Sequence, residues 1–245
     1  MKLFHFSKKK DHTAANESYM KWLEFYNKGN IAQAIVWLKK SAEQGHATAQ
    51  YNLGVAYAEG KGVIKDYSLA ANWYNKSAEQ KNAEASFNLG SLYFYGQGFS
   101  QDDKQAAYWY SKAAELGQAN AQCMLGGLYH YGRGVTQDYE QAVYWYRKSA
   151  EQGYAMAQGN LGTLYCEGKG VSQDYKQAIY WLEKSANQGN ANDQCNLGLL
   201  YANGKGVPQD FKQALSWFDK SAKQGNVNAQ NNMRILLTQH MGKPL

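Results

Sequence analysis

The sequence is poor in the residues that mark several large classes of protein. It has 2 Pro, 3 Cys and only three Arg in 245 residues, and it contains no apolar run close to the ~20 residues needed to span a bilayer. We therefore expect no membrane segment, and the composition excludes collagen-like and intrinsically disordered chains. The three Cys (Cys123, Cys166 and Cys195) are odd in number and widely spaced, which argues against a disulfide framework and favours a reducing cytoplasm.

The net charge of +6 raises the question of nucleic-acid binding. Lys supplies almost all of the positive charge, whereas Arg is the preferred fork for phosphate groups. The basic residues are scattered, with no basic stripe interleaved with aromatics, so we expect no nucleic-acid partner. In segment 1–12, a four-residue apolar patch precedes Lys8, Lys9 and Lys10. This patch is too short for a secretory signal, so we expect a disordered basic tail and a cytoplasmic protein.

A strict internal period is the dominant feature of the chain. Six of the seven Trp recur every 36 residues, at positions 37, 73, 109, 145, 181 and 217. A fixed period of this length is typical of stacked helical repeats. Alignment of the chain with itself predicts an N-terminal capping helix pair, five full repeats, and a C-terminal capping helix and tail. The predicted boundaries are 13–46, 47–82, 83–118, 119–154, 155–190, 191–226 and 227–245.

Each full repeat is expected to form two helices joined by a Gly-x-Gly loop. In the first repeat, Ala49, Leu53 and Tyr57 share one helical face, which predicts the packing face. The loop glycines are expected to adopt positive φ, and the Asp that follows, such as Asp66, is placed to cap the second helix. Three departures stand out: Lys81 replaces a helix-ending Gly, Asp193 replaces a packing Ala, and Arg234 replaces the Gly of the Leu-Gly pair.

The repeated motifs read Ala-x-Ala-Gln-Tyr-Asn-Leu-Gly-x-x-Tyr, Gly-x-Gly-Val-x-x-Asp-Tyr and Ala-x-x-Trp-Tyr-x-Lys-Ser-Ala-Glu-Gln-Gly. This pattern resembles the Sel-1-like repeat family, whose 36-residue repeat is related to the tetratricopeptide repeat. The resemblance implies an all-α fold, a right-handed α-α superhelix (α-solenoid) of tetratricopeptide-like helix pairs. It also implies a scaffold or adaptor for other proteins, common in bacterial interaction systems.

Positions that vary between repeats form a stripe on the first helices, which we expect to lie opposite the packing face. In tetratricopeptide modules the corresponding positions line a concave groove that receives ligands. Exposed aromatics are typical interface anchors, and the stripe carries Glu but no Lys or Arg, which favours a neutral-to-basic or apolar partner protein. The candidate partner-binding residues are Tyr51, Glu59, Glu84, Phe87, Asn88, Phe94, Tyr95, His130, Tyr131, Asn160 and Glu167.

A ladder of Asn residues lies beside this stripe, at positions 52, 88, 160, 196 and 232. Two interpretations remain open. The amides could bind the backbone of an extended peptide, or they could link adjacent helices and satisfy buried polar groups.

The sequence offers no catalytic constellation. The five His never approach a metal-ligand spacing, and no carboxylate pair or Cys-His pair recurs in one place. We expect no enzyme activity, no metal and no cofactor, and a monomeric protein. The function predicted is a non-enzymatic protein-protein interaction scaffold. The alternative is an immunity or inhibitor protein that neutralises an enzymatic toxin by direct binding.

Overall fold

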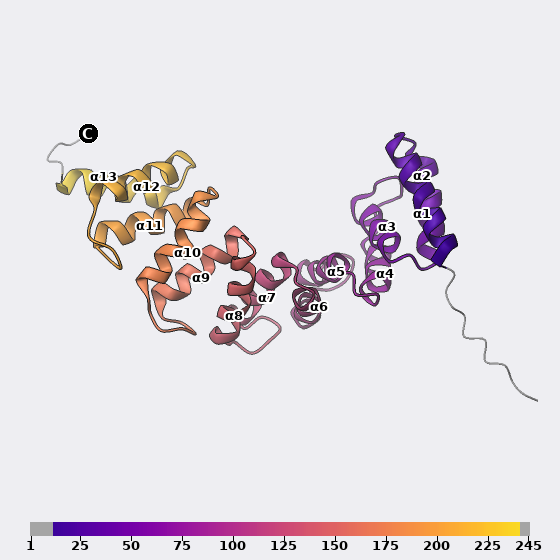
Figure 1. The fold of residues 1–245 in the computed structure, drawn as a ribbon, viewed down its shortest axis with the longest axis horizontal. Coiled ribbons are helices and arrows are strands. Elements are labelled where there is room, and N and C mark those ends of the chain that lie inside the picture. Colours follow the sequence, from indigo (N-terminus) through magenta and orange to yellow (C-terminus); the bar gives the residue numbers. More distant parts are fainter. Residues whose placement is uncertain (1–11, 241–245) are drawn as a thin grey trace, which may run out of the picture. The chain divides into compact units, whose positions relative to one another are not determined.

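A computed structural model describes residues 12–240, and these form α-helices joined by short loops, with no strand among them (Figure 1). The helices are α1 (His12–Asn27), α2 (Ile31–Glu43), α3 (Ala47–Glu59), α4 (Tyr67–Ala78), α5 (Ala83–Tyr95), α6 (Asp103–Glu115), α7 (Ala119–Tyr131), α8 (Tyr139–Glu151), α9 (Ala155–Glu167), α10 (Tyr175–Asn187), α11 (Ala191–Asn203), α12 (Phe211–Lys223) and α13 (Val227–His240). The predicted tail at 1–12 lies outside the described residues, apart from His12 at the start of α1.

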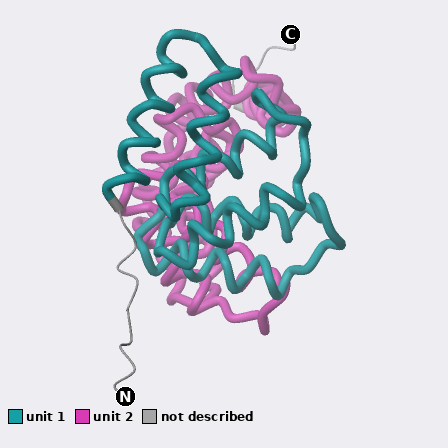
Figure 2. The backbone as a smooth tube through the Cα atoms, turned by 90° about the vertical axis from the view of Figure 1, so that its right-hand side faces the viewer, with its two compact units in different colours: residues 1–118 teal, residues 119–245 magenta. Residues whose placement is uncertain are grey.

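The chain divides into two compact units, which meet in sequence at Gln118 and Ala119 (Figure 2). The first unit contains α1 to α6 and the second contains α7 to α13. Within each unit, helices pack mainly against their neighbours in the chain, so that α3 contacts α2 and α4, and α9 contacts α8 and α10. The predicted fold class, an all-α solenoid of helix pairs, is confirmed.

The helix ends follow the predicted turn chemistry. Asp66 precedes α4 with an extended backbone, and its carboxylate accepts a hydrogen bond from the amide of Leu69 at 2.9 Å. The equivalent Asp before each later second helix caps in the same way, at positions 102, 138, 174 and 210. Gly60 ends α3 with φ of 75°, a left-handed conformation that costs Gly little. Loops of one geometry therefore set the angle between the two helices of every full repeat.

The predicted Leu-Gly close approach explains how the two helices of a repeat pack. Leu53 is fully buried, and the neighbouring Gly54 faces the ring of Tyr74 on α4. A Cβ atom added at Gly54 would lie 2.6 Å from that ring, so any larger residue would force the helices apart. Gly90 with Tyr110, Gly126 with Tyr146 and Gly198 with Phe218 repeat the contact. In four of the five full repeats an aromatic ring thus lies against a Gly, and in repeat 155–190 Leu182 lies against Gly162.

Side-chain hydrogen bonds at 36-residue intervals add to this packing. The hydroxyl of Ser77 donates to the carbonyl of Ala47 at 2.7 Å, and Ser149 and Ser221 do the same in their own repeats. Gln80 donates to Oε1 of Gln50 at 2.7 Å. Gln50 in turn donates to the carbonyl of Ala42, in the preceding helix pair, at 3.1 Å. A buried amide thus links helix pairs that are consecutive in the chain.

Candidate partner-binding face

The predicted site residues fall into two groups, because some lie on first helices of the first unit and the others on first helices of the second unit. Tyr51, Glu59, Glu84, Phe87, Asn88, Phe94 and Tyr95 lie on α3 and α5 of the first unit, and His130, Tyr131, Asn160 and Glu167 lie on α7 and α9 of the second. Tyr95 and Tyr131 are the most exposed of the aromatics, at 65% and 69%. Glu59, Glu84 and Glu167 are also exposed, whereas the remaining six residues are half-buried.

The expectation that the whole variable stripe lies opposite the packing face is wrong in part. Cys123, Gly159 and Cys195 are buried, although they belong to the stripe. The physical reason is contact between consecutive first helices: a Cβ atom at Gly159 would overlap the carboxylate of Asp193 on α11. In the second unit this stripe position is therefore part of the interface between repeats.

Large aromatic rings occupy the same stripe position in the first unit. Tyr51 lies 6.0 Å from Tyr74, and Phe87 lies 5.5 Å from Tyr110, measured between ring centroids. Phe94 meets Tyr95 edge-on at 5.0 Å. These rings pack in part on the second helix of their repeat and are half-buried. Their exposed parts and the exposed Tyr95 together form an aromatic surface. We call the surface formed by Tyr51, Val55, Glu59, Glu84, Phe87, Phe94 and Tyr95 the first-helix face.

Lys residues from the loops bring positive charge to a stripe that has none of its own. Lys61 forms an ion pair with Glu59 at 2.5 Å, and Lys169 forms one with Glu167 at 2.8 Å. Among the described residues Glu84 has no such pair. Burial raises the pKa of Tyr51, and the negative charge of Glu84 acts in the same direction. Glu84 is therefore the exposed carboxylate of the first-helix face that has no ion pair within residues 12–240.

His130 occupies an aromatic setting in the second unit. Its ring stacks on Tyr131 at 4.4 Å and meets the edge of Tyr139 at 5.4 Å. Burial lowers the pKa of His130, while the charge of Glu167 partly opposes this change. Its Nδ1 atom is buried and has no hydrogen-bond partner.

The Asn ladder connects consecutive helix pairs. The amide of Asn52 donates to the hydroxyl of Tyr19 on α1 at 3.4 Å, and the amide of Asn232 donates to Sγ of Cys195 at 3.8 Å. Asn88 hydrogen-bonds to Tyr51 and Tyr74 of the preceding repeat. Of the two interpretations left open, these contacts favour the structural one at positions 52, 88 and 232. These contacts do not involve Asn160, for which both interpretations stay open.

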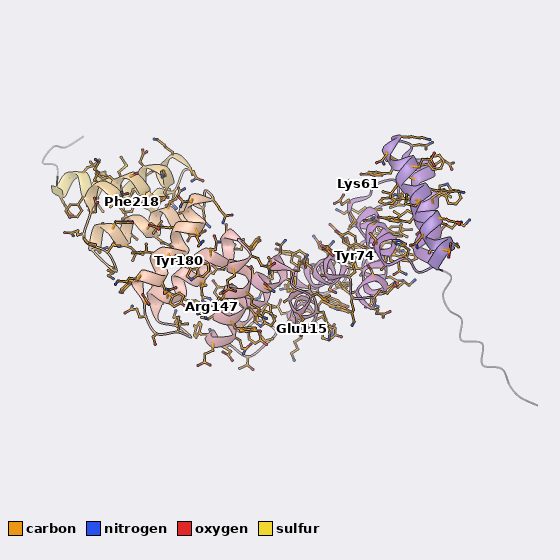
Figure 3. The ribbon with its side chains drawn as sticks, viewed as in Figure 1. Lys61, Tyr74, Glu115, Arg147, Tyr180 and Phe218 are labelled. Atoms are coloured by element: carbon orange, nitrogen blue, oxygen red, sulfur yellow. The ribbon has the colours of Figure 1, made fainter. Side chains whose placement is uncertain are left out.

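One feature of the first unit was missed from the sequence. An apolar pocket of about 520 Å³ opens between α1, α2 and α3. Lys61, in the loop after α3, is one of the residues that line it, and Figure 3 labels its position. Leu38 lines the pocket at the position where repeats 47–82, 83–118 and 119–154 have a buried Tyr, and Leu182 holds the same position fully buried in repeat 155–190. The Leu alone is therefore not a signal from which the pocket could have been predicted. The main lining residues are Trp22, Tyr26, Ile31, Ile35, Leu38 and Val55.

The cysteines are poorly suited to nucleophilic chemistry. Burial raises the pKa of Cys123 to about 12 and that of Cys166 to about 11, so both thiols are protonated at neutral pH. Within residues 12–240, no three His, Cys, Asp or Glu side chains gather as a metal site. None of the helices in that range is both long and apolar enough to cross a membrane.

Comparison with known proteins identifies the repeat. The Sel1 repeat model matches residues 26–46, 47–82, 83–118, 119–154, 155–190 and 191–226. The chain belongs to the Sel1 repeat family. Members of this family are generally non-catalytic scaffolds for protein interactions. The search of curated proteins found no match.

Two solved Sel1 repeat structures are similar to this one. The first is c5321, a protective antigen of uropathogenic Escherichia coli, with 36% identity over 93% of this chain and a TM-score of 0.86. This chain spans 50% of the c5321 chain. The second is a Sel1 repeat protein from Oxalobacter formigenes, with 35% identity, a TM-score of 0.79, and coverage of 92% of this chain and 89% of the other.

Proposed function

We propose that this Sel1 repeat protein is a non-enzymatic adaptor that binds another protein through the first-helix face of its first unit. The observation that carries the proposal is the run of aromatic surface from Tyr51 and Phe87 to the exposed Tyr95. Aromatic side chains that are partly packed and partly exposed lose little entropy on binding, and they are common interface anchors. His130, Tyr131, Asn160 and Glu167 offer a second, smaller surface in the other unit.

The charge of the first-helix face favours a partner with basic or apolar residues. Glu84 is exposed and without an ion pair among residues 12–240, whereas Glu59 forms an exposed ion pair with Lys61. A partner Lys or Arg placed near Glu84 would gain an interaction at little desolvation cost.

Photo-crosslinking from defined positions tests the proposal. A photoreactive amino acid at position 95 should trap a partner protein in cells, whereas the same residue at position 108 should not. Tyr108 is the matched control, because it is 52% exposed in the same unit but lies on a second helix. Equal trapping from both positions, or trapping only from 108, would move the binding surface away from the first-helix face.

Surface variants give an independent measurement with the trapped partner. Tyr95→Ala and Glu84→Lys remove exposed groups, so the fold should be unaffected and affinity should fall about tenfold for the double variant. If the trapped partner is an enzyme whose activity is lost on mixing with the native chain, the protein acts as an inhibitor. The binding face would be the same in that case.

A further inference from the structure

The apolar pocket beside α1 is continuous with the first-helix face. Val55 belongs to that face and also lines the pocket, and Lys61, at the pocket mouth, is paired with Glu59 of the face. The electrostatic influence of Glu59 extends to Tyr51, which is also influenced by Glu84. The pocket is therefore one end of the surface already assigned to partner binding.

Apolar side chains remain exposed at the mouth of the pocket. Tyr26 is 51% exposed and Ile31 is 40% exposed. Elsewhere in the first unit a Tyr ring fills the equivalent space: Tyr74 and Tyr110 are 2% and 0% exposed and lie against a Gly. In the α1–α2 pair, Leu38 holds the position of that ring, and a volume of about 520 Å³ beside it is open to solvent. A volume of this size accommodates one or two large apolar side chains.

The charges around the pocket limit what can enter it. The walls are mainly apolar, and the charged group that lines the pocket, Lys61, forms an exposed ion pair with Glu59. Farther along the face, the exposed carboxylate of Glu84 has no cation among the described residues. An apolar anchor with a positive charge a few residues away would match this arrangement, because the anchor leaves water and the charge meets Glu84.

We propose that the pocket receives one bulky apolar side chain of a partner protein, from a segment that also carries Lys or Arg and continues along Tyr51 toward Glu84. This inference rests on the proposed function and specifies the chemistry of the segment that binds. The anchor side chain enters between Trp22, Ile31 and Leu38, and the basic residue lies beside Glu84.

Short peptides of defined chemistry provide the probe. The first is an acetylated and amidated heptapeptide, Ser-Gly-Phe-Gly-Lys-Lys-Ser. Its two controls replace Phe by Ala and both Lys by Glu. In NMR titrations of the full chain, the Phe-Lys-Lys peptide should shift the indole resonance of Trp22 but not those of Trp181 or Trp217. Both control peptides should bind at least about tenfold more weakly. Equal binding by all three would overturn the proposal.

Matched variants connect the binding to the pocket. Val55→Phe should fill the pocket and weaken peptide binding about tenfold. Thr163→Phe is the control, because it makes a similar change at the same repeat position on α9 and should leave binding unchanged. Tyr26→Ala removes an exposed wall of the pocket. This variant provides a second test of the pocket in case the Val55→Phe chain does not fold. The assignment would be overturned if Tyr26→Ala retains binding and a correctly folded Val55→Phe chain retains it too.

Two further outcomes separate this inference from the proposed function. If crosslinking from position 95 traps a partner and Val55→Phe leaves that trapping unchanged, the first-helix face stands and the pocket proposal fails. If removal of residues 1–11 tightens peptide binding about tenfold, the chain's own segment competes for the pocket, and a partner segment is not its resident occupant. Unchanged affinity after that removal supports the proposal.

Discussion

Asp193 is a buried carboxyl group at a position that elsewhere holds a small apolar side chain. It is 5% exposed on α11, and its counterparts are fully buried Ala residues at positions 49, 85, 121, 157 and 229. The hydroxyl of Ser185 donates to Asp193 Oδ2 at 2.6 Å, and Asn196 also hydrogen-bonds to the carboxylate. The extra volume fits because the facing residue, on α9, is Gly159. The two departures from the repeat pattern therefore compensate each other.

We expect Gly159→Ala and Asp193→Ala to be strongly coupled in a double-mutant cycle. Gly159→Ala alone should destabilise the chain by about 1 to 3 kcal/mol, because the new Cβ atom would overlap the carboxylate. In the Asp193→Ala background the same change should be neutral or stabilising by up to about 1 kcal/mol, because Ala favours the helix over Gly. Urea unfolding of the four proteins measures the coupling. Additive effects would show that the residues do not compensate each other.

Asp193 should also make stability depend on pH. Burial raises its pKa in the folded state, and the hydrogen bonds from Ser185 and Asn196 only partly oppose this. The native state thus binds the proton more tightly than the unfolded state does. The resulting stabilisation is fully present below the unfolded value of about 4 and is lost as pH rises through the higher folded pKa. Asp193→Asn should flatten this part of the profile, as measured by urea unfolding from pH 3 to 7. An unchanged profile would contradict the assignment.

At the scale of elements, the connection between α4 and α5 is the least regular. Lys81 has φ of 64°, and it is the non-Gly residue with positive φ in the described chain. Gly45, Gly117, Gly153, Gly189 and Gly225 hold the equivalent position, with φ between 86° and 98°. Lys81 thus adopts the left-handed conformation of the Gly that it replaces, and we expect local strain there.

Lys81→Gly should stabilise the chain by about 1 kcal/mol, because a side chain in this conformation carries a penalty that Gly avoids. The reverse change at an equivalent site, Gly153→Lys, should destabilise it by a similar amount. Gly153 is a suitable match because a Cβ atom there would meet nothing within 4 Å, so backbone strain alone is tested. Amide exchange around 81–83 should slow in the Lys81→Gly chain. Uniform protection of this segment in the native chain would contradict the local strain.

Much of each element could be predicted from the sequence because its determinants are local. Asp66 caps α4 through an amide three residues away, and Gly60 ends α3 through its own backbone. The burial of Cys123 and Gly159 could not be predicted in this way, because it depends on how closely consecutive first helices approach. The pocket at Leu38 is similar: the substitution is visible, but the open volume depends on Trp22 and Val55 from other helices.

At the scale of the whole molecule, contacts within each unit run mainly between helices that are neighbours in the chain. Stability in such a stack is approximately a sum over repeats and their nearest interfaces, so local damage should remain local. Leu53→Ala, at a fully buried site on α3, should cost about 2 to 5 kcal/mol. Hydrogen exchange should show the largest loss of protection in α2, α3 and α4, and a smaller loss in α6. An equal loss in all helices of the first unit would indicate one cooperative block.

The hydrogen bond between the Gln80 and Gln50 side chains, which we call the glutamine bridge, also bears on how such a chain can lengthen. Both amides of the bridge, such as Gln50 and Gln80, lie 30 residues apart inside one 36-residue repeat. A duplication of that length therefore copies donor and acceptor together, and the new copy needs only the carbonyl of the preceding pair, as Gln50 needs that of Ala42. Repeat 83–118 has Ser86 and Leu116 at these two positions, so both members of the bridge are replaced in the same copy. Inheritance in whole repeats keeps the pair intact, and divergence within a repeat can remove both members without leaving a stranded amide.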